Sequence, residues 1–310
     1  MTSDRWGVPV ELGERRLLHP GMLKWLRALG WMVALTFIAT LPAGLAINGL
    51  DTVLPDAGWA QVVANSGGAL VCLAAYGLAV WLAENRTPDE ISLRALPGGL
   101  AAGLAIGLLM FSAVMAIMAA FGLYDMVWQG AAPAWESTAK SIQSGVMEEI
   151  VARAVILRLI WAAFGRRYGP WIAFAAASAL FGAGHLANPN SSVFAAVCIA
   201  VEAGIMLGAF YALTGRLWVS IGVHAAWNFA QGYIFGAAVS GTDFGPHIMA
   251  STARAGFPEW LTGGGFGPEA SLPGLFIGTL VGVVVMWMAW KAGRFAPAAP
   301  ATLAQAEAFS

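Results

Sequence analysis

Residues 95–124 read ALPGGLAAGLAIGLLMFSAVMAIMAAFGLY and contain no Lys, Arg, Asp or Glu. About 20 consecutive apolar residues are enough for a helix to cross a lipid bilayer. Further runs of similar length without any charge lie at residues 28–50, 57–83, 217–242 and 270–290. This pattern predicts that the chain folds around membrane-spanning helices.

The composition agrees with that prediction. Of the 310 residues, 59% are hydrophobic and 11% are charged, whereas about 25% of the residues in soluble domains are charged. A water-soluble enzyme, a nucleic-acid-binding protein and a disordered scaffold are therefore excluded. The two cysteines lie within apolar runs and indicate no disulfide framework.

Three less pure segments, at residues 138–164, 170–187 and 193–214, are also long and apolar enough to cross. We therefore predict an all-α polytopic membrane protein with about eight transmembrane helices. Lys and Arg accumulate on the cytoplasmic side of membrane proteins. With eight spans, one side holds only Lys140 and Arg254, and the other holds Arg5, Arg15, Arg16, Lys24, Arg27, Arg86, Arg94, Arg166, Arg167, Arg216, Lys291 and Arg294. This distribution predicts that both termini are cytoplasmic.

Glycines form two notable patterns in the sequence. Gly99, Gly103 and Gly107 recur every four residues, as expected where two membrane helices pack closely. The segment 241–270 is rich in Gly and Pro, which is typical of an irregular connection or of a re-entrant, lid-like loop. We predict a cytoplasmic N-terminal segment at 1–27, a membrane domain at 28–292 and a disordered tail at 293–310.

The fourth predicted span contains the run MEEIVARAVILR, residues 147–158, with four charged side chains. A charge in the hydrocarbon region costs at least about 2.5 to 3.5 kcal/mol, so each one needs a partner or a function. Positions four apart share a helix face, which predicts a pair between Glu149 and Arg153. Glu148 points about 100° away and lacks that partner. Glu148 is therefore free for proton chemistry.

Two histidines and an amide also lie in apolar runs. His185 follows Phe181 by four residues in the fifth span, and His224 precedes Asn228 by four residues in the seventh. A carboxylate, imidazoles and an amide at one site could hydrolyse a peptide bond with an activated water. Glu148 would act as the base, His224 and Asn228 would stabilise the oxyanion, and His185 would orient the water.

These motifs together resemble those of a known family. The pattern E-E-x-x-x-R, then F-x-x-x-H, then H-x-x-x-N on three membrane helices is similar to the CAAX-processing and bacteriocin-processing (CPBP, Abi) intramembrane proteases, which include the type II CAAX prenyl proteases. The resemblance covers about residues 138–238 and implies a catalytic core there. It implies that Glu148 is the catalytic base, that Glu149 and Arg153 support it, and that His224 and Asn228 form the oxyanion site. His185 would then contact a water or a metal ion.

Some alternatives stay open at this stage. Zinc could be held by Glu148, His185 and His224, or the same residues could form a metal-free site. Glu202 in the sixth span could make a structural hydrogen bond or an accessory contact in the site. The chain could also be a non-catalytic immunity or scaffold member of the same family, or a proton-coupled membrane transporter.

The expected partners are a membrane-associated protein or peptide substrate and the lipid bilayer, with no nucleic acid. The expected chemistry is endopeptidase cleavage, of the CAAX type or of a bacteriocin or leader peptide. The high usage of Ala, Gly, Trp and Leu favours an integral protein of a bacterial cytoplasmic (inner) membrane.

Overall fold

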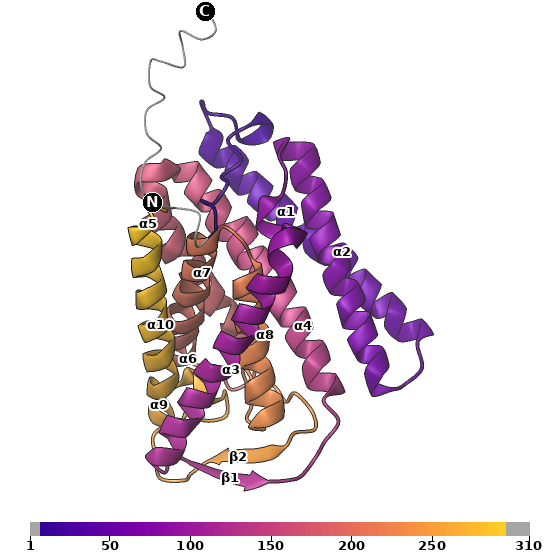
Figure 1. The fold of residues 1–310 in the computed structure, drawn as a ribbon, viewed down its shortest axis with the longest axis vertical. Helices are drawn as coiled ribbons and strands as arrows, with labels where there is room; N and C mark the ends of the chain where they lie inside the picture. The colour runs from indigo at the N-terminus through magenta and orange to yellow at the C-terminus, as the bar shows by residue number, and fades with distance from the viewer. Residues whose placement is uncertain (1–6, 296–310) are drawn as a thin grey trace, which may run out of the picture.

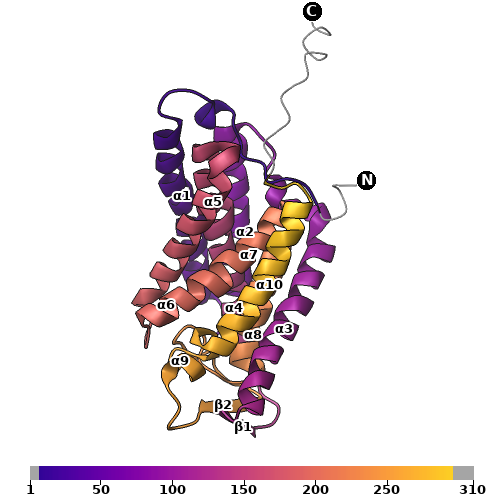
Figure 2. The ribbon, with the colours of Figure 1, turned by 90° about the vertical axis from the view of Figure 1, so that its left-hand side faces the viewer.

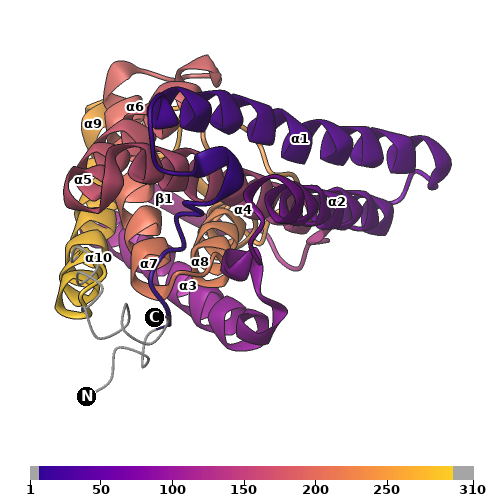
Figure 3. The same cartoon turned by 90° about the horizontal axis from the view of Figure 1, so that it is seen from above.

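The computed structural model describes residues 7–295, and this part of the chain is mostly helical (Figure 1). Its helices are α1 Lys24–Val53, α2 Gly58–Glu84, α3 Leu96–Ala120, α4 Trp135–Glu149, α5 Arg158–Gly184, α6 Val193–Ile199, α7 Met206–Thr214, α8 Trp218–Phe229, α9 Glu259–Thr262 and α10 Leu272–Lys291. Helices α1 and α2 form a pair that extends away from the rest of the bundle (Figures 1 and 3).

Five helical segments of the described residues are long and apolar enough to cross a membrane. They are Lys24–Val53, Gly58–Glu84, Asp89–Ala120, Val193–Thr214 and Leu272–Lys291. Each coincides with one of the eight predicted spans. The remaining three predicted spans are also helical over much of their length, but they carry more polar residues, and their crossing of the membrane stays a prediction.

The fourth and fifth predicted spans form one helical stretch with a break. Helix α4 continues through a π-helix, Ile150–Leu157, into α5, and Gly165 interrupts α5 with φ 72° and ψ 179°. Because a positive φ is easily adopted only by glycine, the break falls between the two predicted segments. The seventh predicted span ends earlier than expected. Its helix continues α8 through the π-helix Ala230–Ile234 and then turns at Gly236, which also has a positive φ, so the boundary at 242 was wrong.

A two-stranded antiparallel ribbon is the exception to the predicted all-α fold. Strand β1, Tyr124–Trp128, pairs with β2, Met249–Ala253, in a register that places Tyr124 opposite Ala253. The ribbon ties the segment after α3 to the Gly- and Pro-rich segment 241–270 at one end of the bundle (Figure 2). Tyr124 also donates a hydrogen bond to the Thr262 carbonyl of α9 at 2.8 Å. The segment 241–270 is therefore an irregular connection that packs onto the bundle.

The glycine stripe of α3 lies against α8, as its spacing predicts. A Cβ at Gly103 would lie 2.3 Å from the Val219 carbonyl oxygen, and one at Gly107 would lie 2.3 Å from that of Val223. The two backbones are therefore in contact, with no room for a side chain. This contact fixes the position of α8, which carries His224 and Asn228.

We expect Gly103→Val to lower both the melting temperature and the activity of the protein, because the new side chain must push α3 away from α8. Overpacking of this kind costs about 1 to 3 kcal/mol or more. Gly98→Val is the matched control, since a Cβ at Gly98 on the same helix meets no atom within 4 Å. Thermal melts of the purified proteins in detergent check this; equal melting temperatures for the two variants would contradict it.

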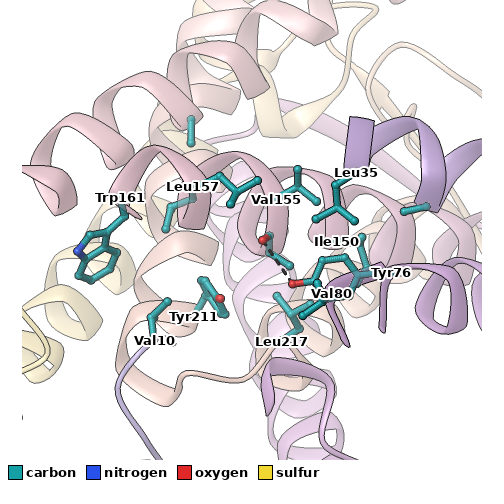
Figure 4. Close-up of a cluster of buried hydrophobic side chains, with 14 of the residues drawn as sticks. Val10, Leu35, Tyr76, Val80, Ile150, Val155, Leu157, Trp161, Tyr211 and Leu217 are labelled. Carbon is teal, nitrogen blue, oxygen red and sulfur yellow. Dashed lines mark hydrogen bonds between the residues drawn. The ribbon is translucent and has the colours of Figure 1, made fainter. Parts of the chain in front are cut away.

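A core of buried apolar side chains fills the half of the bundle where α2 ends and α8 begins (Figure 4). It includes Tyr76, Ile150, Val155, Leu157 and Leu217, all at most 1% exposed. The N-terminal segment contributes Val10, Leu12 and Leu18 to this core. At the other end of the chain, the ring of Phe295 stacks on Trp161 with 5.9 Å between centroids. Most of the predicted tail, from 296 on, lies outside the described residues.

A buried ionic network lies beside this core. Arg158 donates two hydrogen bonds to Glu84, at 2.9 and 2.7 Å, and Arg86 donates two to Glu90, at 2.8 and 2.7 Å. Arg86 also binds Glu84 at 2.7 Å, and the Tyr76 hydroxyl donates to Glu90. The four charged side chains are almost inaccessible to solvent. Arg86, which the charge count treated as a loop residue, is thus part of the interior.

Candidate active site

The two adjacent glutamates lie at the end of α4 and have different surroundings. The Glu149 side chain is fully buried, and its Oε2 lies 3.1 Å from Nε of Arg153. The Glu148 side chain is 40% exposed. This is the arrangement that the four-residue spacing predicts, with one carboxylate paired and its neighbour accessible.

Arg153 connects three helical segments. Besides facing Glu149, its Nη2 donates a 2.7 Å hydrogen bond to the Ala203 carbonyl in the π-helix Ala200–Ile205. Its guanidinium lies 4.6 Å from the centre of the Phe181 ring of α5, within range of a cation–π contact. Arg153 therefore neutralises Glu149 and also holds the neighbouring helices in place.

His224 lies between the two glutamates. Its Nδ1 is 3.0 Å from Glu149 Oε1, and its Nε2 is 3.9 Å from Glu148 Oε2. Because a carboxylate accepts hydrogen bonds, the Nδ1 atom carries the hydrogen in the shorter contact. The buried Glu149 thus orients the imidazole, and the other ring nitrogen faces the accessible Glu148.

His185 is held by the phenylalanine of its own motif. Its Nδ1 lies 2.8 Å from the Phe181 carbonyl oxygen, one helical turn earlier, and the two rings are 4.9 Å apart. A carbonyl oxygen only accepts, so Nδ1 is the donor. In the neutral ring Nε2 then bears the lone pair, and it can accept a hydrogen bond from a water molecule.

Asn228 lies one turn after His224 on α8, and its side-chain amide donates a 3.0 Å hydrogen bond to the Ser144 hydroxyl of α4. Ser144 precedes Glu148 by four residues, so it lies on the same face of α4. Sequence reasoning did not select Ser144, although this spacing was visible. The contact ties α8 to α4 directly beside Glu148.

These residues converge on one pocket of about 650 Å³. Glu148 of α4, His185 after α5, and His224 and Asn228 of α8 all line it. Residues 239–244 form another part of the wall, and Thr40 of α1 lies on the side facing the α1–α2 pair. The structure therefore brings Glu148 together with Asn228, which lies 80 positions later in the sequence (228 − 148).

The comparison with known families covers the same region. Residues 130–230 match the family model described as type II CAAX prenyl endopeptidase Rce1-like. This segment is similar to the Rce1-like family. The match includes all six predicted site residues and confirms the resemblance that the three motifs indicate. No curated protein and no solved structure matches the chain.

The Rce1-like segment contains a feature that the motifs did not reveal. Two π-helices lie within it, Ile150–Leu157 directly after Glu149 and Ala200–Ile205, which contains Glu202. A third, Ala230–Ile234, begins at its last residue, two positions after Asn228. Such π-helical turns are frequent at functional sites, because they disturb the regular helical register and shift the following side chains. A single extra residue per turn leaves no clear trace in hydrophobic periodicity.

A second pair of carboxyl groups lies beside this pocket. Glu202 and Glu269 line a small cavity of about 30 Å³ together with His185, His224 and Asn228. Glu269 accepts hydrogen bonds from the backbone N–H and the hydroxyl of Ser240, both at 2.7 Å. Burial raises the pKa of Glu269 above its ordinary value. Glu202 therefore lies at the edge of the site, and Glu269, in the irregular segment 241–270, was missed.

Residues 7–295 contain no set of ligands placed to bind zinc. No group of three or more His, Cys, Asp or Glu side chains in this range is placed to hold a metal ion. A tetrahedral zinc site needs three or four such ligands around one point. Glu148, His185 and His224 share a pocket but do not form such a group.

Proposed function

We propose that this protein is an intramembrane endopeptidase that hydrolyses a peptide bond in a membrane-associated protein or peptide. The observation that carries the proposal is the placement of Glu148. Its carboxylate is accessible in a pocket that His185, His224 and Asn228 also line, whereas the neighbouring Glu149 is buried and paired with Arg153. The match to an endopeptidase family supports the same conclusion.

The first step is the attack of water on the scissile carbonyl. Glu148 takes one proton from the water while the water oxygen bonds to the carbonyl carbon. The C=O electron pair moves onto the carbonyl oxygen. His185 Nε2 accepts a hydrogen bond from the attacking water and orients it. The product of this step is a tetrahedral oxyanion, with the proton on Glu148.

The oxyanion is stabilised by donors from α8. His224 donates through Nε2 in its imidazolium form, which the adjacent Glu149 and Glu148 carboxylates stabilise, and Asn228 can donate through its amide. When the intermediate collapses, the C–N bond breaks and Glu148 returns its proton to the leaving amine. The products are a carboxylic acid and an amine, and Glu148 is again a carboxylate.

We expect Asn228→Ala to lower kcat by about 10²- to 10³-fold with little change in KM, because it removes a donor used mainly in the transition state. Ser144→Ala is the matched control, since it removes only the hydroxyl that the Asn228 amide contacts. Its expected loss is at most about tenfold. Steady-state kinetics on a cleaved reporter measures both variants; a change in KM alone for Asn228→Ala would contradict the oxyanion role.

The function itself is tested by comparing membrane-protein termini in cells that express either the wild type or Glu148→Gln. The proposal predicts new termini that occur only with the wild type. Identical sets of termini, with both proteins inserted at equal levels, would contradict it.

A further inference from the structure

The two ends of the helix bundle differ in charge. Among the described residues, the end formed by the start of α1, the end of α2 and the end of α10 holds Arg15, Arg16, Lys24, Arg27, Arg86, Arg94, Arg166, Arg167, Arg216, Lys291 and Arg294. We call it the basic end. The opposite end, which we call the ribbon end, carries β1 and β2 (Figures 1 and 2).

The ribbon end has few basic residues, and both are paired with acids. Lys140 lies 2.8 Å from Glu136, and Arg254 lies 2.7 Å from Asp125. Asp51, Asp56, Asp243 and Glu259 are further acids at this end. Because Lys and Arg are retained on the cytoplasmic side, this asymmetry makes the ribbon end the non-cytoplasmic end.

The polar part of the pocket wall lies toward the ribbon end. Its lining includes Lys140 near the start of α4, Asn188 after α5, and Ser240 and Thr242 in the segment that leads to β2. Asn188 and Thr242 border the pocket from irregular segments, and Thr242 is exposed. These residues place the mouth among the connections of the ribbon end.

The basic end is closed above the site. Of the residues that follow Glu149, Val151, Ala152 and Ile156 line the pocket with apolar side chains, whereas Ile150 and Val155 are 0% exposed in the buried core (Figure 4). Arg158, two turns further, is also 0% exposed and is bound to Glu84. A polypeptide approaching from the basic end would have to displace both the core and this ion pair.

We propose that the pocket receives its substrate from the non-cytoplasmic side of the membrane. The substrate class is then a membrane-anchored polypeptide whose scissile bond lies in the outer half of the bilayer or just outside it. A C-terminal peptide presented in the cytoplasm does not fit this geometry. Thr40, near the middle of α1, lines the pocket, so an anchored segment can reach it from the bilayer. That the molecule entering the pocket is a substrate rests on the proposed function, but the direction of access does not depend on activity.

The direction of access is tested by labelling variants with one added cysteine in intact cells with a membrane-impermeant maleimide. The native Cys72 and Cys198 are buried, so the wild type gives the unlabelled baseline. Asp243→Cys reports the ribbon end, Arg167→Cys reports the basic end, and Glu148→Cys reports the interior of the pocket; all three side chains are at least partly exposed. We expect labelling of the Asp243 and Glu148 variants in intact cells, and of the Arg167 variant only after permeabilisation.

Labelling of the Arg167 and Glu148 variants in intact cells, with the Asp243 variant protected, would overturn the inferred access while leaving the protease function intact. Labelling of the Asp243 variant with protection of the Glu148 variant would also overturn it, since the pocket would then open elsewhere.

A second arm places one identified cleavage sequence on either side of a single-span carrier protein. Wild-type cleavage only on the non-cytoplasmic side supports the inference, and cleavage only in the cytoplasm contradicts it. Cleavage by Glu148→Gln as well would instead contradict the proposed function.

Discussion

Glu148→Gln is expected to lower kcat by about 10²- to 10⁴-fold, the usual contribution of a positioned general base, while leaving the protein folded. The amide has nearly the same shape as the carboxylate but cannot take a proton from water. The Glu148 side chain is 40% exposed in the pocket and carries no buried ion pair, so its replacement leaves the core intact. Single-turnover kinetics on the purified protein gives the rate, and a thermal melt checks the fold.

The control for this variant is a carboxylate outside the site. Glu259→Gln on α9 removes an exposed acid of the same type and should leave the rate unchanged. A Glu148→Gln protein that retains more than about a tenth of the wild-type rate would contradict the role of Glu148 as the base. A large loss of melting temperature would instead show that Glu148 supports the fold.

Arg153→Leu is expected to lower the stability of the protein by about 3 to 5 kcal/mol, because it leaves the carboxylate of Glu149 buried without its cation. Arg153 is 1% exposed and Glu149 is 0% exposed, so water cannot replace the lost partner. The variant should also be inactive, since Glu149 positions His224. Thermal melts in detergent and the kinetic assay measure the two effects.

Two further variants separate charge from packing. Arg94→Leu removes an exposed arginine at the basic end and should change stability by less than about 0.5 kcal/mol. Adding Glu149→Leu to Arg153→Leu removes the stranded charge and should recover much of the stability but none of the activity. Full activity in the Arg153→Leu protein would contradict the account.

The helices could be predicted from the sequence because charge is so unevenly distributed along it. The charge-free run 95–124 and its counterparts match α1, α2, α3 and α10, and the less pure run 193–214 matches the α6–α7 stretch. Helical geometry alone also predicted the pairing of Glu149 with Arg153, because positions four apart lie on one face. The pairing persists although a π-helix begins at Ile150.

Contacts between distant segments could not be predicted in this way. The pairing of β1 with β2 joins residues about 125 positions apart, and no local sequence pattern predicts it. Likewise, the sequence does not show how deeply a charged side chain is buried. Arg86 was therefore counted among the loop residues, whereas it joins Arg158 in a buried network with Glu84. The meeting of α4, α5 and α8 at one pocket followed from the family resemblance, because each motif alone is too short to locate its partners.

Chemical rescue tests whether Glu148 activates the water. Glu148→Ala leaves space in the pocket for a small carboxylate, and formate can then act as the base in solution. Glu148→Ala should be inactive alone, and its cleavage rate should rise with formate concentration, whereas Asn228→Ala should show no such response. Cleavage by Glu148→Ala at the wild-type rate without formate would contradict it.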